Sequence, residues 1–195
     1  MIDTHSHIYT EEFDADRTEV ILRARQAGVD KIILPNIDSE SLPRMLALEA
    51  QYPDYCYAAI GLHPTSVKAD FQDELRLVKK ELERRQFIAI GEIGMDLYWD
   101  KTFIEEQKKA LHQQIEWALE YNLPVILHVR DAFDETMGVI SHYENTNLRG
   151  VFHSFTGTEE QAAQILQLQS FYIGINGVVT FKNSDLKTVL KTVPL

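Results

Sequence analysis

Short apolar runs alternate with longer amphipathic segments along almost the whole chain. Seven of these runs are predicted to be strands, at residues 1–4, 31–35, 56–61, 87–92, 124–128, 150–153 and 171–175. Their nearly continuous apolar character is typical of strands that are covered on both faces, as in a parallel sheet. The pattern therefore predicts an α/β fold built from successive strand–helix units.

The segments between the strands carry residues that commonly begin and end helices. Asp14 or Asp16 can cap a helix that ends at Gly28, because glycine readily adopts the left-handed conformation found beyond helix ends. Thr158 and Gln161 have the spacing of a capping box, in which each side chain binds a backbone N–H at the start of a helix. No linker or internal repeat interrupts the pattern, so we expect a single domain over residues 1–195.

Composition narrows the class of protein. The 195 residues are 45% hydrophobic, enough for one large core, and carry a formal net charge of −11. That charge argues against nucleic-acid binding through a broad basic surface, but it allows a phosphate substrate in a pocket that holds cations. No apolar stretch approaches the roughly 18 residues of a membrane span, and the single cysteine, Cys56, lies in an apolar run. We expect a cytoplasmic protein with a buried, reduced thiol and no membrane partner.

Most histidines of the chain follow or end predicted strands. In parallel barrels the strand ends meet at one rim, where active sites lie. A single histidine there is often structural, but several imidazoles and a carboxylate together are costly to bury unless they bind a ligand such as a metal ion. The residues of this set are His5, His7, His63, Glu92, His128 and His153.

This set of side chains has the chemistry of a metal centre. His5 and His7 are two residues apart, so on a strand they point to the same face and can reach one ion. Imidazole nitrogens suit zinc, manganese or nickel, and a carboxylate extends the choice to magnesium. Glu92 is placed to bridge that ion and a second one bound by His128 and His153. Two ions about 3.5–4 Å apart can share a hydroxide and favour hydrolysis at phosphorus.

Five ordered motifs make the sequence similar to a known family. The motifs are Asp3-Thr4-His5-Ser6-His7, Gly61-Leu62-His63-Pro64, Gly91-Glu92-Ile93-Gly94-Met95-Asp96, Leu123-Pro124-Val125-Ile126-Leu127-His128-Val129-Arg130 and His153-Ser154-Phe155-Thr156-Gly157. In their order and spacing the chain resembles the TatD family of metal-dependent deoxyribonucleases, in the amidohydrolase-like superfamily, over essentially its whole length. Met95, where a leucine is usual, and Ser154 and Thr156 are chemically mild departures.

The resemblance implies a TIM-type (β/α)8 barrel with a nuclease site at its mouth. It implies DNA, with RNA as a further option, as the substrate of a 3′-to-5′ exonuclease acting on single strands, and two divalent cations (Mg, Mn or Zn) as cofactors. It implies no obligate protein partner. The metal ligands carried over are His5, His7, Glu92, His128 and His153, and the phosphate-binding residues are His63 and Arg130.

Two side-chain roles have simpler alternatives. Arg130 offers a planar fork for phosphate oxygens, or it forms a surface salt bridge with Asp131 or Asp134. Tyr98 and Trp99 can stack on a base, or they pack within their own loop.

Two other functions remain open from the sequence. The same site could serve another metal-dependent hydrolase, such as a D-aminoacyl-tRNA deacylase, although the chain has no lysine at a strand end to bridge two metals by carbamylation. The chain could also be an inactive fragment. It ends at residues 192–195, where an eighth strand would begin, and the aspartate of the family's Thr-Asp motif has no match. We expect a barrel truncated after about seven strand–helix units that binds the first ion weakly and has little nuclease activity.

Overall fold

Strands and α-helices alternate along the chain from β1 to α7. The computed structural model describes residues 1–194, which contain seven strands and seven α-helices. The strands are β1 (Ile2–Asp3), β2 (Lys31–Pro35), β3 (Cys56–Ala59), β4 (Ile90–Asp96), β5 (Val125–Arg130), β6 (Gly150–Phe152) and β7 (Phe171–Ile173). The α-helices are α1 (Arg17–Gln26), α2 (Leu42–Gln51), α3 (Phe71–Arg84), α4 (Ile104–Glu120), α5 (Phe133–Ile140), α6 (Glu159–Gln167) and α7 (Leu186–Val189).

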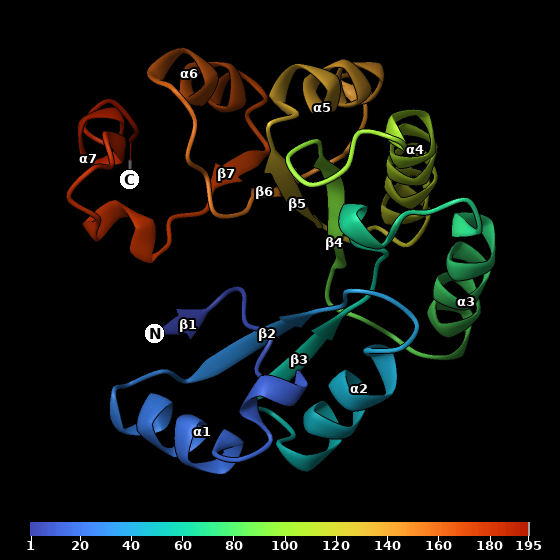
Figure 1. Cartoon of the computed structure of the whole chain (residues 1–195), viewed down its shortest axis with the longest axis vertical. Helices are drawn as coiled ribbons and strands as arrows, with labels where there is room; N and C mark the ends of the chain where they lie inside the picture. Colours follow the sequence, from blue (N-terminus) through green and yellow to red (C-terminus); the bar gives the residue numbers. More distant parts are fainter. Residues whose placement is uncertain (195) are drawn as a thin grey trace.

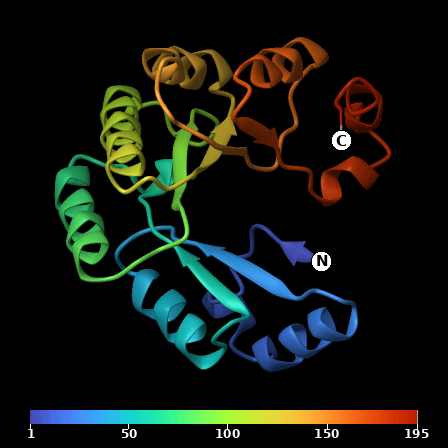
Figure 2. The ribbon, with the colours of Figure 1, turned by 180° about the vertical axis from the view of Figure 1, so that it is seen from behind.

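The strands are parallel and follow one another in sequence order. They form a three-stranded sheet, β1-β2-β3, and a four-stranded sheet, β4-β5-β6-β7. An isolated parallel bridge between Ile60 and Ile90 joins the two sheets. The strands lie inside and the helices outside, seen from either side (Figures 1 and 2). Within residues 1–194, β1 pairs only with β2 and β7 only with β6. The predicted α/β barrel class is confirmed.

Apolar side chains fill two layers. The larger cluster joins helices to strands and includes Leu111 and Ile115 of α4 and Ile93 of β4. The smaller cluster consists of Ala59, Ala89 and Ile126, with Ile33 and Val151 packed against it, and contains no helix residue among those described. This inner layer borders a cavity of about 560 Å³ at the beginnings of the strands. Burial on both faces explains why the strand sequences show no polar alternation.

Strand β4 differs from its predicted bounds. The sequence predicted residues 87–92, which would end the strand at Glu92, whereas the observed strand continues to Asp96. The pairing of β4 with β5 shifts register between Ile90 and Ile93 and then continues through Gly94 to Asp96. Every residue of β4 is buried, so its polar side chains point into the molecule and do not mark a turn.

Two predicted helix signals are confirmed and one is not. Gly28 has φ +82° just beyond α1. The capping box of Thr158 and Gln161 is present at the start of α6. Asp16 occupies the N-cap position of α1, but neither it nor any other side chain caps that helix start by a hydrogen bond. The predicted burial of Cys56 is also confirmed, and its thiol is free.

In the described part of the chain, every helix is too short or too polar to cross a membrane.

Candidate metal centre

Glu92 occupies the middle of a group of histidines on the inner side of the strands. Its side chain is only 2% exposed. One carboxylate oxygen, Oε2, lies 3.0 Å from His5 Nε2 and 3.2 Å from His7 Nε2. The other, Oε1, lies 2.9 Å from His128 Nδ1 and 3.6 Å from His63 Nε2. Burial alone would raise the pKa of the Glu92 carboxyl, but hydrogen bonds that the surrounding imidazoles donate when a proton lies between them and the carboxylate hold that pKa well below its usual range. Glu92 is therefore an anion shared by two pairs of histidines.

Tyr9 determines which nitrogen of His7 carries a proton. The Tyr9 hydroxyl donates its only proton to the Pro35 carbonyl, at 2.5 Å, and lies 2.9 Å from His7 Nδ1. It can only accept a hydrogen bond from His7, so Nδ1 carries the hydrogen. Burial raises the pKa of Tyr9, which keeps its hydroxyl protonated. Neutral His7 therefore directs the lone pair of Nε2 at Glu92, the orientation that a metal ligand needs.

Asp96 determines which ring nitrogen of His128 carries a hydrogen, as Tyr9 does for His7. Its Oδ2 lies 2.8 Å from His128 Nε2, and a carboxylate can only accept, so Nε2 carries the hydrogen. The lone pair of neutral His128 is then on Nδ1, directed at Glu92. Burial opposes a charge on His128, but Glu92 and Asp96 outweigh burial and raise its pKa.

His63 has the opposite arrangement. The backbone N–H of Thr65 donates to His63 Nδ1 at 3.2 Å, so in the neutral ring the hydrogen is on Nε2. That nitrogen lies 3.2 Å from His128 Nδ1. Burial lowers the pKa of His63, which favours this neutral form. His63 therefore presents a hydrogen-bond donor where His7 and His128 present acceptors.

His153 lies beside His5 and outside both groups around Glu92. The two rings stack, with centroids 3.3 Å apart and an angle of 11° between their planes. Burial, followed by the proximity of His5, lowers the pKa of His153 to about 3, so it stays neutral at ordinary pH. His5 Nδ1 is buried and has no hydrogen-bond partner among the described residues. The structure thus brings His153 next to the predicted ligands and gives it no polar contact with Glu92.

The donor set fits divalent cations. His5, His7 and Glu92 form one compact group of possible ligands, and His63, Glu92 and His128 form another. Lone pairs of His7 and His128 that converge on an anionic carboxylate repel it unless positive charge lies between them. Such a site attracts a proton, as the raised pKa of His128 shows, and offers the same nitrogen and oxygen atoms to a metal ion.

Arg130 lies at the outer edge of the centre, two residues beyond His128 on β5. Its guanidinium carbon is 3.8 Å from the centroid of the Tyr98 ring and 5.1 Å from that of Trp99. Within residues 1–194, Asp131 and Asp134 form no ion pair with it. The arginine is therefore positioned by aromatic rings, and its N–H groups are available to an anion.

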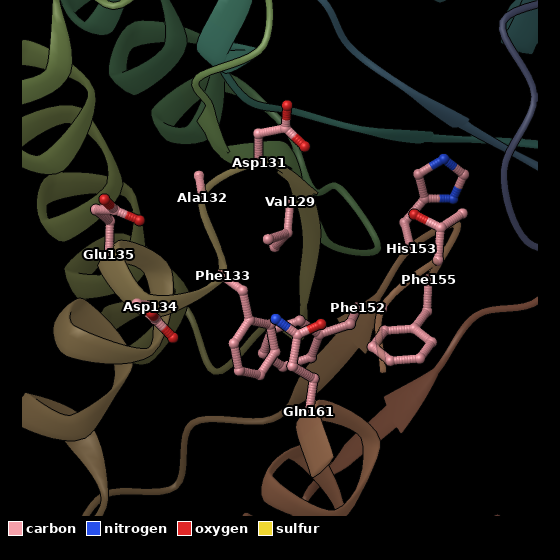
Figure 3. Close-up of a pocket in the computed structure, with 12 residues that line it drawn as sticks. Val129, Asp131, Ala132, Phe133, Asp134, Glu135, Phe152, His153, Phe155 and Gln161 are labelled. Carbon is pink, nitrogen blue, oxygen red and sulfur yellow. The ribbon is translucent and has the colours of Figure 1, made fainter. Parts of the chain in front are cut away.

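A pocket of about 440 Å³ adjoins the centre on the side of α5 and α6. His153 lines it together with Phe133, Phe152 and Phe155, and Figure 3 shows these side chains around the hollow. The charged groups of its lining are all acidic: Asp131, Asp134 and Glu135. Three carboxylates and no cationic side chain make this side of the mouth unfavourable for a phosphate chain.

Parallel strands that converge on partly buried histidines and a shared, buried carboxylate define a metal-dependent hydrolase of the α/β barrel class. Residues 2–195 match the family model described as TatD related DNase, and the chain belongs to that family.

Characterised and uncharacterised relatives agree with this assignment. The uncharacterized metal-dependent hydrolases YabD of Bacillus subtilis and YjjV of Escherichia coli are 35% and 38% identical to the chain. The 3′-5′ ssDNA/RNA exonuclease TatD of Dickeya dadantii is 33% identical. Each comparison covers 100% of this chain and 76%, 75% and 74% of the respective relative. The crystal structure of Escherichia coli YjjV matches with a TM-score of 0.88 at 37% identity, over 100% of this chain and 75% of that one.

The sequence analysis did not identify two residues of this site. Tyr9 and Thr65 each lie two positions after a histidine, His7 and His63, and each contacts Nδ1 of that histidine. A polar residue two positions beyond a candidate ligand is therefore the sequence signal that could have found them.

Proposed function

We propose that this chain hydrolyses phosphodiester bonds of single-stranded DNA or RNA from the 3′ end, with two divalent cations. The observation that carries the proposal is the buried Glu92 carboxylate, which offers one oxygen to His5 and His7 and the other to His128 and His63. One carboxylate between two groups of imidazoles is suited to bridge two ions. The relatives named 3′-5′ ssDNA/RNA exonucleases support the choice of substrate.

The proposed metal ligands are the five residues identified in the sequence. His5, His7 and Glu92 would hold the first ion, and Glu92 and His128 the second. His153, neutral and adjacent to His5, is proposed to complete the ligand set, although it makes no contact with Glu92. When bound, the cations would supply Lewis-acid activation of water and neutralise charge that develops at the phosphate.

His63 and Arg130 are proposed to bind the scissile phosphate. The proton on His63 Nε2 makes that nitrogen a donor, which suits a phosphate oxygen better than a metal ion. Arg130 extends from the same strand as His128 and lacks a carboxylate partner within residues 1–194. The two side chains would thus provide a hydrogen-bond donor and a positive charge to the phosphate.

Metal content and nuclease activity measured on the same preparation test the proposal. We expect divalent ions at both groups of ligands around Glu92 by elemental analysis, with the first ion bound more weakly than the second, and loss of 3′-to-5′ cleavage of a labelled single strand in EDTA. Manganese, magnesium or zinc should restore cleavage. Undiminished cleavage in EDTA would exclude the proposed mechanism. Release of an amino acid from a D-aminoacyl-tRNA without cleavage of DNA or RNA would show that the proposed substrate is wrong and that the chain is a deacylase.

Two substitutions distinguish a residue that binds metal from a residue that contacts only the substrate. Glu92→Gln should lower cleavage by several orders of magnitude and reduce the bound metal, because it removes the charge shared by both ions. His63→Ala should lower cleavage by about 10²-fold and leave the metal content unchanged, since it removes one donor to the phosphate. His112→Ala, in α4, is the control for loss of an imidazole remote from Glu92. Equal metal loss in Glu92→Gln and His63→Ala would assign His63 to the ligands.

A further inference from the structure

The segment between β4 and α4, residues 97–103, exposes two adjacent aromatic side chains next to the candidate metal centre, and we call it the aromatic loop. Tyr98 is 52% exposed and Trp99 is 69% exposed. Their ring centroids are 4.8 Å apart and the ring planes are almost perpendicular, at 87°. Aromatic side chains that only pack a loop are mostly buried, so this exposure points to a ligand.

The position of the loop is fixed by Asp96. One oxygen of this buried carboxylate, Oδ1, accepts the backbone N–H of Tyr98 at 3.0 Å and that of Trp99 at 3.3 Å. The other oxygen holds His128 Nε2. The Leu97 N–H also donates to the Arg130 carbonyl at 2.9 Å. The aromatic residues are thus tied to the strand ends that carry His128 and Arg130.

The charges around the loop favour a phosphate chain on this side of the mouth. The Arg130 guanidinium lies over the Tyr98 ring. Lys68 reaches the same region, because its Nζ is 5.4 Å from the centroid of the Phe103 ring and 3.7 Å from Asp100 Oδ2. The part of the mouth beyond β5 is the acidic pocket near α5. A polyanion therefore meets less repulsion along the aromatic loop.

We propose that Tyr98, Trp99 and Arg130 form a stacking platform that holds one nucleobase of the substrate beside the metal centre. The inference rests on the proposed function and adds a subsite to it. A flat π-system can stack on the exposed face of Trp99 or Tyr98 regardless of base identity, while Arg130 contacts the adjacent phosphate. Substrate binding should therefore not depend on which base occupies this position, but it should require that a base be present there.

The kinetic test compares oligonucleotides with and without bases in the three nucleotides at the 3′ end. Trp99→Ala should raise KM for the normal oligonucleotide roughly tenfold, a typical effect of losing one stacked base. It should leave KM for the abasic oligonucleotide and the bound metal unchanged. Trp99→Phe should restore most of the affinity, and Tyr172→Ala, an exposed aromatic on β7 at the beginnings of the strands, should behave as wild type. An equal effect of Trp99→Ala on both oligonucleotides would overturn the proposal.

A fluorescence test does not depend on cleavage. The chain has two tryptophans, and Trp117 is buried at 8% exposure. Trp117→Phe leaves Trp99 as the only tryptophan, and a single-stranded trinucleotide should quench its emission. Trp99→Phe leaves Trp117, which should not be quenched. Quenching without cleavage would keep the platform and reject the proposed function, whereas cleavage without quenching of Trp99 would reject the platform alone.

Discussion

Tyr9 and Thr65 determine which ring nitrogen carries the proton in the two histidines that precede them. Tyr9 leaves Nε2 of His7 unprotonated, and Thr65 leaves Nε2 of His63 protonated. Two chemically identical side chains thereby receive opposite hydrogen-bonding roles at the same carboxylate. Partners of this kind commonly contribute as much to a site as the ligands they orient.

The role of Tyr9 can be measured directly. Tyr9→Phe removes the acceptor for His7 Nδ1, so His7 is no longer held in the form that points a lone pair at Glu92. We expect metal affinity to fall about 10- to 100-fold, as for loss of other groups that orient a ligand. Competition with a fluorescent chelator gives the affinity, and Tyr57→Phe is a control at a hydroxyl that contacts Lys31. Unchanged affinity with a normal melting curve would contradict the assignment.

At the scale of elements, β4 must pass very close to β5. Gly94 has φ +142°, and a Cβ added there would lie 2.0 Å from the carbonyl oxygen of His128. A side chain at this position would separate the two strands at the residue that carries a proposed ligand. The requirement for glycine is therefore both conformational and steric.

Two alanine substitutions test this close approach. Gly94→Ala should destabilise the protein by more than the roughly 1–3 kcal/mol of backbone strain alone, because the clash is with backbone. Gly138→Ala, within α5, has open space around the added Cβ and should stabilise the helix by about 0.5–1 kcal/mol. Urea unfolding of both variants gives the two free energies. A small loss for Gly94→Ala would mean that β4 and β5 separate easily.

The sequence predicted the positions of the elements better than their ends. Apolar runs located all seven strands because burial on both faces leaves a clear pattern. The continuation of β4 to Asp96 was missed because Gly94 and Asp96 resemble turn residues in a sequence. Their burial comes from a register shift against β5, which depends on contacts distant in sequence.

The candidate site was predictable in membership and less so in geometry. The structure brings His5, His7, Glu92 and His128 together as expected, although Glu92 and His128 lie within β4 and β5 and the two N-terminal histidines follow β1. The stacking of His153 on His5 was not predictable, because it depends on the path of the chain after β6, where Ser154 adopts φ +49°. Local side-chain direction at a loop is set by such backbone angles, which residue types alone do not specify.

At the scale of the whole molecule, a net charge of −11 limits how nucleic acid can bind. Few cationic side chains lie along the aromatic loop: Lys101 is part of it, and Arg130 and Lys68 contact its aromatic rings. Affinity must therefore come mostly from stacking and from the metal centre. Salt competes with phosphate contacts and has little effect on stacking.

The salt dependence of binding measures this balance. For about two or three phosphate contacts to a single strand, log Kd should change with log salt concentration with a slope of about 2 or less. Anisotropy of a labelled oligonucleotide with a phosphorothioate backbone that resists cleavage, bound to the unsubstituted protein with its metal, gives the slope between about 50 and 300 mM salt. A slope steeper than about 5 would reveal an extended basic surface and contradict the charge argument.

Asp96 binds the aromatic loop with one oxygen and His128 with the other. One carboxylate therefore positions both the proposed base-stacking site and a proposed metal ligand. A ligand that immobilises either side lowers the entropic cost of ordering the other, which makes binding at the two sites cooperative. Thermodynamic linkage requires reciprocity: the factor by which a trinucleotide tightens metal binding must equal the factor by which metal tightens trinucleotide binding. Asp96→Asn weakens the support and should bring both factors close to one in paired titrations. In the unsubstituted protein, this linkage would make the metal ions bind most tightly when a substrate is present.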